Sequence, residues 1–159
     1  TGHGTVVGLY EAHQRWGTLP WSEVIAPAID LAEKGIKVSH DLAWALNAKA
    51  VVLSANPEAC DIYFSSCSGF AKEGDRLKQP ALAKTLKLIA KNGADAFYKG
   101  LIAKQISDDM KKNGGLIRLS DLKKYKARVI EPISTDYRSY QVVSTNRFYY
   151  PRFIFFEIR

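Results

Sequence analysis

The chain has 159 residues, which is enough for one domain with its own core. It carries 23 basic and 16 acidic residues, a formal net charge of +7. The basic residues are scattered, without a run of five like charges, a zinc-finger pattern or an RNA-recognition motif. The composition therefore favours solvated helix faces and argues against a nucleic-acid-binding protein.

The two cysteines, Cys60 and Cys67, have six residues between them. One pair is not a disulfide framework, and the spacing is not the CxxC of a metal site. Two interpretations stay open, namely free thiols or a local disulfide formed in an oxidising compartment. With three His and no HExxH phrase, the sequence predicts no metal site.

Helical periodicity in the first third predicts short helices separated by turn signals. A first helix is expected over Val7–Trp16, closed by Gly17. Ser22 is expected to cap a second helix, and Gly35 to end it with a left-handed residue. The predicted core face of this second helix consists of Val24, Ala28, Leu31 and Ala32.

In the middle of the chain, Ser39 is expected to cap a helix that Asn56 and Pro57 stop. In residues 60–78, Ile62 and Phe64 are expected to form a short extended piece, and a turn-rich loop is expected after it. This part of the sequence predicts one long helix and little regular structure after it.

The next predicted helix begins at Pro80, a residue suited to the first helical position, and Gly93 ends it. A helix over 102–110 and a short one capped by Ser120 come next. The segments 129–134 and 140–144 are rich in β-branched and aromatic residues and are expected to be extended.

Local phrases appear in a specific order along the chain. They are GTVVGL, GTLPW, APAIDLAEKG, GDRLKQPALAKTLKLIAKNGADAFYKG, GGLIRLSDLKKY and EPISTDYRSYQV. Taken together and in this order, they closely resemble the large subunit of bacterial γ-glutamyltranspeptidases, from about residue 4 to about residue 144. The predicted domain division is therefore a large-subunit segment over 1–145 and an aberrant tail over 146–159.

The resemblance implies an α+β fold, namely a helix-rich segment of an N-terminal-nucleophile hydrolase with an αββα sandwich. Members of the family are precursors that cut themselves into a large and a small subunit. The new N-terminal threonine of the small subunit attacks the γ-glutamyl amide of glutathione, and water or an amino acid accepts the acyl group. The implied partners are glutathione, γ-glutamyl acceptors and the small subunit. No cofactor is implied, and the implied location is the periplasm or the cell exterior.

None of the family's functional residues can be placed on this chain. The nucleophile phrase, Thr-Thr-His-aromatic-Ser, does not occur, and the arginine that clamps the substrate carboxylate precedes the matched region. Thr1-Gly2-His3 imitates part of the phrase, but Gly4 and Thr5 follow it in place of an aromatic residue and a serine. The sequence therefore predicts no catalytic, substrate-binding or metal residue, and no activity for this chain alone.

Isolated polar groups have simpler interpretations. His13 and His40 lie on predicted helices without a neighbouring nucleophile, and His40 is expected at the surface or as a cap. Asp75 and Arg76 could suggest an acid–base pair, but an exposed loop-to-helix salt bridge of little energetic value is expected. An alternative function remains, a non-catalytic helical module that binds an acidic partner through its positive charge.

The final stretch, NRFYYPRFIFFEIR, differs from the rest in its crowd of aromatic residues. It is not a membrane helix, because a span needs about 20 apolar residues and charges and a proline interrupt this one. The window Phe153–Phe156 has the composition of an aggregation-prone strand. Because composition changes where the resemblance ends, our hypothesis is that the reading frame shifts near Thr145.

The frameshift hypothesis predicts what the neighbouring DNA encodes. Resequencing the gene across codon 145 is expected to give, in another frame, a Pro-Pro-Pro-Ser-Ser-Gly-Gly-like phrase and further on the threonine phrase. If neither alternative frame encodes such a phrase, the frameshift hypothesis is wrong.

Overall fold

The computed structural model describes residues 4–64, 70–144 and 157–158. It divides into two units, Thr1–Tyr125 and Lys126–Arg159. The predicted boundary at residue 145, the Thr1–His3 start and the Phe153–Phe156 window lie outside the described residues. The elements of the first unit are α1 (Thr5–Trp16), α2 (Trp21–Lys34), β1 (Ile36–Lys37), α3 (His40–Ala48), α4 (Ala50–Ser54), α5 (Pro57–Tyr63), β2 (Arg76–Leu77), α6 (Pro80–Asn92), α7 (Asp95–Tyr98), α8 (Leu101–Lys112) and α9 (Leu119–Lys124).

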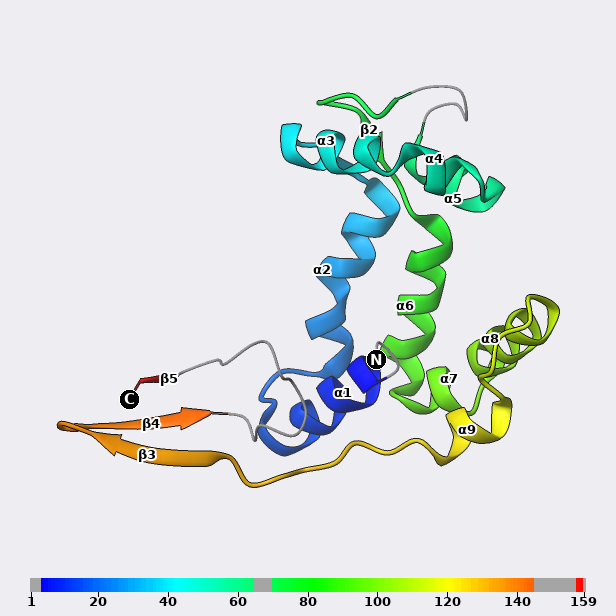
Figure 1. Ribbon diagram of the computed structural model, residues 1–159. Coiled ribbons are helices and arrows are strands. Elements are labelled where there is room, and N and C mark those ends of the chain that lie inside the picture. The colour runs from blue at the N-terminus through cyan, green and yellow to red at the C-terminus, as the bar shows by residue number, and fades with distance from the viewer. Residues whose placement is uncertain (1–3, 65–69, 145–156, 159) are drawn as a thin grey trace. The chain divides into compact units, whose positions relative to one another are not determined.

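Helices α2 and α6 lie side by side, and the contact between them is the most extensive between two elements of the first unit (Figure 1). At one end the indole Nε1 of Trp21 donates to the carbonyl of Ile89 over 3.0 Å. At the other end the amide of Gln79 donates to the carbonyl of Ala32 over 2.9 Å. The start of α2 thus meets the end of α6, so the two helices run antiparallel.

The N-terminal end of α1 is held by a tyrosine hydroxyl. The first amides of a helix have no partner within the helix, and the Tyr98 hydroxyl accepts from the Val7 amide over 3.3 Å. The Tyr98 ring stacks on Tyr125 with centroids 5.7 Å apart, inside a cluster that α1, α7, α8 and α9 share. Burial raises the pKa of the Tyr98 phenol above its ordinary value, although the Val7 amide opposes that shift.

A second cluster lies among α3, α4 and α5. Leu46, Cys60, Phe64 and Ala71 are buried together there. The side chain of Asn47 reaches Ala71 twice, because its Nδ2 donates to the Ala71 carbonyl and its Oδ1 accepts from the Ala71 amide, each over 2.9 Å. The backbone amide and carbonyl of the buried residue Ala71, which lies in no described strand, thereby both have partners.

The second unit contains β3 (Ile133–Tyr137), β4 (Tyr140–Ser144) and β5 (Glu157–Ile158). Strands β3 and β4 form an antiparallel hairpin in which Tyr137 pairs with Tyr140. Arg138 takes a φ of 57° in the turn, and its guanidinium carbon lies 5.4 Å from the Tyr137 ring centroid. Strand β5 pairs antiparallel with β4. The predicted strand over 140–144 is confirmed, whereas β3 begins at Ile133 and not at Val129.

The predicted helix-rich fold is confirmed, together with most helix ends. Ser39 caps α3 as predicted, since its hydroxyl accepts from the Leu42 amide over 3.2 Å. Gly35 and Gly93 follow α2 and α6 with φ of 81° and 65°. Among the described residues, no helix is long and apolar enough to cross a membrane.

Two predicted caps are wrong. Helix α2 begins at Trp21, so Ser22 lies inside it and Pro20 precedes it without a side-chain hydrogen bond. Helix α9 begins at Leu119, and the cap-forming carboxylate is Asp121, whose Oδ2 accepts from the Arg118 amide over 2.9 Å. In both cases the helix starts before the predicted serine.

The predicted structure around residues 49–64 is also partly wrong. The expected single helix breaks at Lys49, which leaves the helical region with a φ of −113°. Asn56 and Pro57 start a helix, because the Asn56 Oδ1 accepts from the Ala59 amide over 3.0 Å. Ile62 therefore lies in α5, and only Phe64 is extended.

The predicted core face of α2 is mostly exposed. Val24 is 49% exposed and Leu31 is 57% exposed, whereas Ala32 is buried. Helix α6 contacts α2 through Trp21 and through Ala32, which belongs to the predicted face. Periodicity thus predicted an apolar face correctly, but in the structure only its Ala32 edge is buried.

Two glycines provide a matched test of packing at α1. Gly93→Ala is expected to lower the free energy of unfolding by about 1–3 kcal/mol, because φ is 65° and a Cβ would lie 2.7 Å from the Tyr10 ring. Gly8→Ala is expected to raise it by roughly 0.5–1 kcal/mol, because Gly8 is helical with open space around it. Urea unfolding measures both, and equal effects would contradict this account.

The buried Tyr98 phenol predicts a loss of stability at alkaline pH. Since its pKa is raised in the folded chain, the unfolded chain loses the proton first, and the free energy of unfolding falls as pH rises above 10.0, the ordinary value. The Tyr98→Phe variant is expected to show a smaller fall, and the exposed control Tyr140→Phe an unchanged one. Urea titrations between pH 8 and 11 measure this, and identical slopes for all three proteins would disprove it.

Candidate functional site

The two histidines of the described chain act as structural groups. His13 Nε2 lies 2.8 Å from the Leu19 carbonyl, and its ring centroid lies 5.0 Å from that of Trp21. His40 Nδ1 lies 3.5 Å from Glu73 Oε2, and its side chain is 80% exposed, as predicted for a surface histidine. Within the described ranges no hydrogen bond joins either ring to a serine, threonine or cysteine, so neither is placed to activate a nucleophile.

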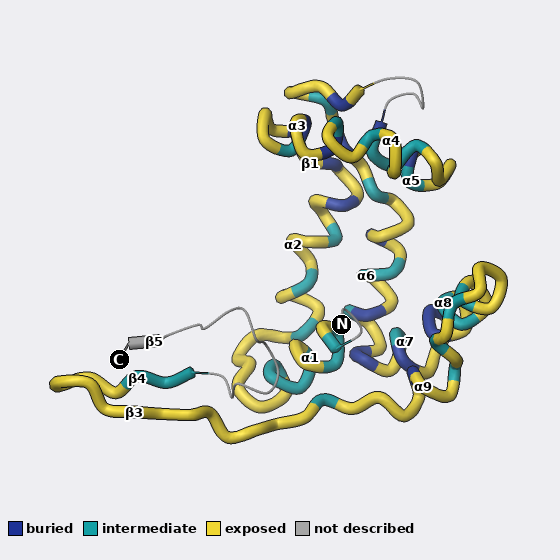
Figure 2. The backbone as a smooth tube through the Cα atoms, in the orientation of Figure 1, coloured by how far each residue is buried: buried dark blue, intermediate teal, exposed yellow. Residues whose placement is uncertain are grey.

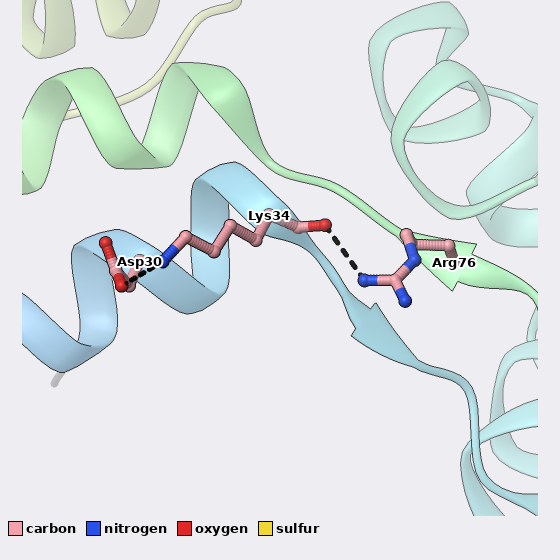
Figure 3. Close-up of polar contacts among 3 residues, drawn as sticks. All are labelled: Asp30, Lys34 and Arg76. Carbon is pink, nitrogen blue, oxygen red and sulfur yellow. Dashed lines mark hydrogen bonds and ion pairs between the residues drawn. The ribbon is translucent and has the colours of Figure 1, made fainter.

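The expected salt bridge between Asp75 and Arg76 does not form. The Asp75 Oδ2 accepts from the Lys72 amide over 2.9 Å. The Arg76 Nη1 donates to the Lys34 carbonyl over 3.2 Å, as Figure 3 shows. The same atom donates to the Gly35 carbonyl over 3.1 Å. These carbonyls end α2, where a positive charge is favourable, so Arg76 serves as a helix cap delivered from β2.

Lys34 takes part in the same arrangement from within the helix. Its ammonium pairs with Asp30 one turn earlier, as Figure 3 shows. The hydrogen bond to Asp30 raises the pKa of Lys34 above its ordinary value. Because both side chains are largely exposed, the pair adds little stability and has no chemical task.

Cys60 is fully buried in the α3–α5 cluster and is disulfide-bonded. The free-thiol interpretation is therefore wrong for Cys60, whereas Cys67 lies outside the described residues. No described cysteine is a free nucleophile. Within the described chain, no group of three or more His, Cys, Asp or Glu could hold a metal ion.

A shallow cavity of about 250 Å³ lies where the β1–β2 ladder meets α5. Val38 and Leu77 in its lining are buried, whereas the charged residues Asp61, Arg76 and Lys78 are exposed. The lining residues are Val38, Asp61, Ile62, Tyr63, Phe64, Ala71, Asp75, Arg76, Leu77 and Lys78. None of the described residues that line the cavity is a serine, threonine, cysteine or histidine.

Sequence reasoning missed this cavity because it expected a turn-rich loop after Ile62 and Phe64 and no strand at residues 76–77. The alternation of Arg76, Leu77 and Lys78 is the signal that could have indicated a strand with one buried side. Strand β2 pairs Leu77 with Ile36, and Arg76 of this strand and Lys78, which follows it, both line the cavity.

Comparison with known proteins places the chain in one family. The γ-glutamyltranspeptidase family model matches residues 3–147. The glutathione hydrolase proenzyme of Escherichia coli (strain K12) is 46% identical over 141 residues, which is 89% of this chain and 24% of that protein. The glutathione hydrolase proenzyme of Bacillus subtilis (strain 168) is 43% identical over 142 residues, again 89% and 24%.

A solved structure agrees with these sequence relatives. The γ-glutamyltranspeptidase of Helicobacter pylori matches with a TM-score of 0.85 and 36% identity, covering 90% of this chain and 41% of that chain. The present chain thus spans about a quarter of the length of the curated relatives, 24% in both cases above. A family match over nearly all of its residues shows that this chain belongs to the γ-glutamyltranspeptidase family.

Proposed function

We propose that this segment is part of a longer polypeptide of the family that acts as a γ-glutamyltransferase. That enzyme takes the γ-glutamyl group from glutathione. The observation that carries the proposal is the match to relatives named glutathione hydrolase proenzyme at 46% and 43% identity. In the proposed reaction an N-terminal threonine, freed by self-cleavage, attacks the γ-glutamyl amide and forms an acyl-enzyme. Water or an amino acid then accepts the acyl group.

The role of the described residues in that protein is structural. Its histidines bind a carbonyl and a surface carboxylate, and its buried cysteine is oxidised. The nucleophile and the groups that bind the glutamyl moiety come from the remainder of the polypeptide, including the small subunit. Glutathione and γ-glutamyl acceptors are thus proposed as substrates of the complete enzyme.

The proposed location is the periplasm or the cell exterior. The disulfide at Cys60 supports it, because disulfides persist in oxidising compartments and are rare in a reducing cytosol. The proposal concerns the complete protein, whose other parts determine any export.

The proposal predicts two activities. The purified 159-residue chain is expected to release no glutamate from glutathione above the buffer background. A chimera of the Escherichia coli relative, carrying residues 4–144 of this chain in place of its own matching residues, is expected to hydrolyse glutathione. Glutamate release measures both, and the unchanged relative is the positive control.

The expectation for the isolated chain and the expectation for the chimera can fail separately. Hydrolysis by the isolated chain would show that these 159 residues contain the catalytic groups. A chimera that folds and matures but hydrolyses no glutathione would show that this segment does not serve the proposed reaction.

A further inference from the structure

The β1–β2 ladder carries a cluster of positive side chains on one face. Lys37 and Arg76 are directly opposite each other in the antiparallel register, so their side chains lie on the same face. Lys78 follows two residues after Arg76, a spacing that places it on that face as well. All three residues are exposed, and Figure 2 shows exposed and buried residues together around β1. We call Lys37, Arg76 and Lys78 the ladder cations.

Gly35 shows that two of the ladder cations run side by side. A Cβ added to Gly35 would lie 2.7 Å from Lys78 Cγ and 2.9 Å from Arg76 Cγ, so both side chains pass over the position where Gly35 has no side chain. Gly35 is itself buried, although its neighbours Lys34 and Ile36 are exposed. Packing on this glycine therefore places the stems of Arg76 and Lys78 close together.

No acidic partner neutralises the ladder cations within the described chain. The ammonium groups of Lys37 and Lys78 form no hydrogen bond or ion pair there. Asp61 lines the cavity beside Arg76 and Lys78, but no ion pair joins it to either. The Oδ2 of Asp75 accepts from a backbone amide of its own loop. Since like charges directly opposite each other destabilise a ladder, an anion bound between them would be stabilising.

Arg76 keeps one edge of its guanidinium for a ligand although it caps α2. Its Nη1 donates to the carbonyls of Lys34 and Gly35, which fixes the plane of the group. Because Nη1 binds these carbonyls, the partial negative charge at the end of α2 is already compensated. Nε and Nη2 have no partner in the described chain, and together they form the paired donors that bind two oxygens of one oxyanion.

We propose that the ladder cations form a binding site for a tetrahedral dianion, the phosphate group of a small molecule. The Nε–Nη2 edge of Arg76 binds two phosphate oxygens, and the ammonium groups of Lys37 and Lys78 bind the remaining ones. A carboxylate has two oxygens and one charge, so it would occupy the Arg76 edge and leave both ammonium groups without an acceptor. Three cations on one face therefore favour phosphate. The proposal does not depend on the proposed reaction.

The chain offers a matched control for the loss of one charge. Lys37→Met and Lys78→Met each remove one ladder cation. Lys104→Met removes the same charge from α8, where Lys104 is exposed and lies in a different part of the first unit. Arg76→Lys keeps the charge and removes the paired donors. All four substitutions are at exposed positions, and circular dichroism checks that each variant is folded.

The test is a nuclear magnetic resonance titration of the isotope-labelled 159-residue chain with inorganic phosphate. Sodium chloride keeps the ionic strength constant, because screening alone would otherwise change with phosphate. Amide signals of residues 35–38 and 76–78 are expected to shift and to saturate with one dissociation constant. Those of α8 are expected to stay in place.

The variants are expected to differ in that constant. Lys37→Met and Lys78→Met are each expected to weaken phosphate binding up to about fivefold, the effect of losing one exposed ion pair. Arg76→Lys is expected to weaken it roughly tenfold, because lysine offers no paired donors. Lys104→Met is expected to leave the dissociation constant unchanged.

The opposite results would overturn the proposal. Equal weakening by Lys104→Met, or signals that shift throughout the chain, would show general attraction of anions to a positive protein. Unchanged binding in both Lys37→Met and Lys78→Met would show that the ladder cations do not converge on the ligand. If phosphate shifts no signal but an aspartate-rich peptide shifts those of residues 35–38 and 76–78, the occupant is an acidic protein segment and not a phosphate.

Discussion

The antiparallel contact between α2 and α6 is the interaction on which the first unit depends. Neither helix can hide its apolar residues alone, and the hydrogen bonds at Trp21 and Gln79 fix both ends of the pair. The α3–α5 cluster follows α2 and precedes α6, whereas the cluster around Tyr98 follows α6. Two small clusters at opposite ends of the pair are thus connected through it (Figure 1).

The sequence predicted those features that residues close in the chain determine. Ser39 caps α3 because its acceptor, the Leu42 amide, is three residues away. Gly35 and Gly93 end helices because only glycine adopts positive φ without strain. Asn56 and Pro57 carry a start signal as strong as their stop signal, and choosing between the two required knowledge of the cluster that Cys60 enters.

Features that depend on distant residues could not be predicted. Periodicity marks Val24 and Leu31 as apolar, but which side of α2 is covered depends on where α6 lies. Arg76 caps a helix that ends more than forty residues earlier, as the separations of 42 and 41 residues show. The assignment of no catalytic residue stays a prediction, because it rests on the absence of the family's phrases from this sequence.

The double hydrogen bond between Asn47 and Ala71 has a consequence for engineering. Because an amide side chain both donates and accepts, Asn47 satisfies the amide and the carbonyl of Ala71 at once. An aspartate at this position only accepts and a leucine does neither, so either would take a partner from the buried backbone of Ala71. A redesign of α3 that keeps the α3–α5 cluster therefore has to keep an amide at position 47.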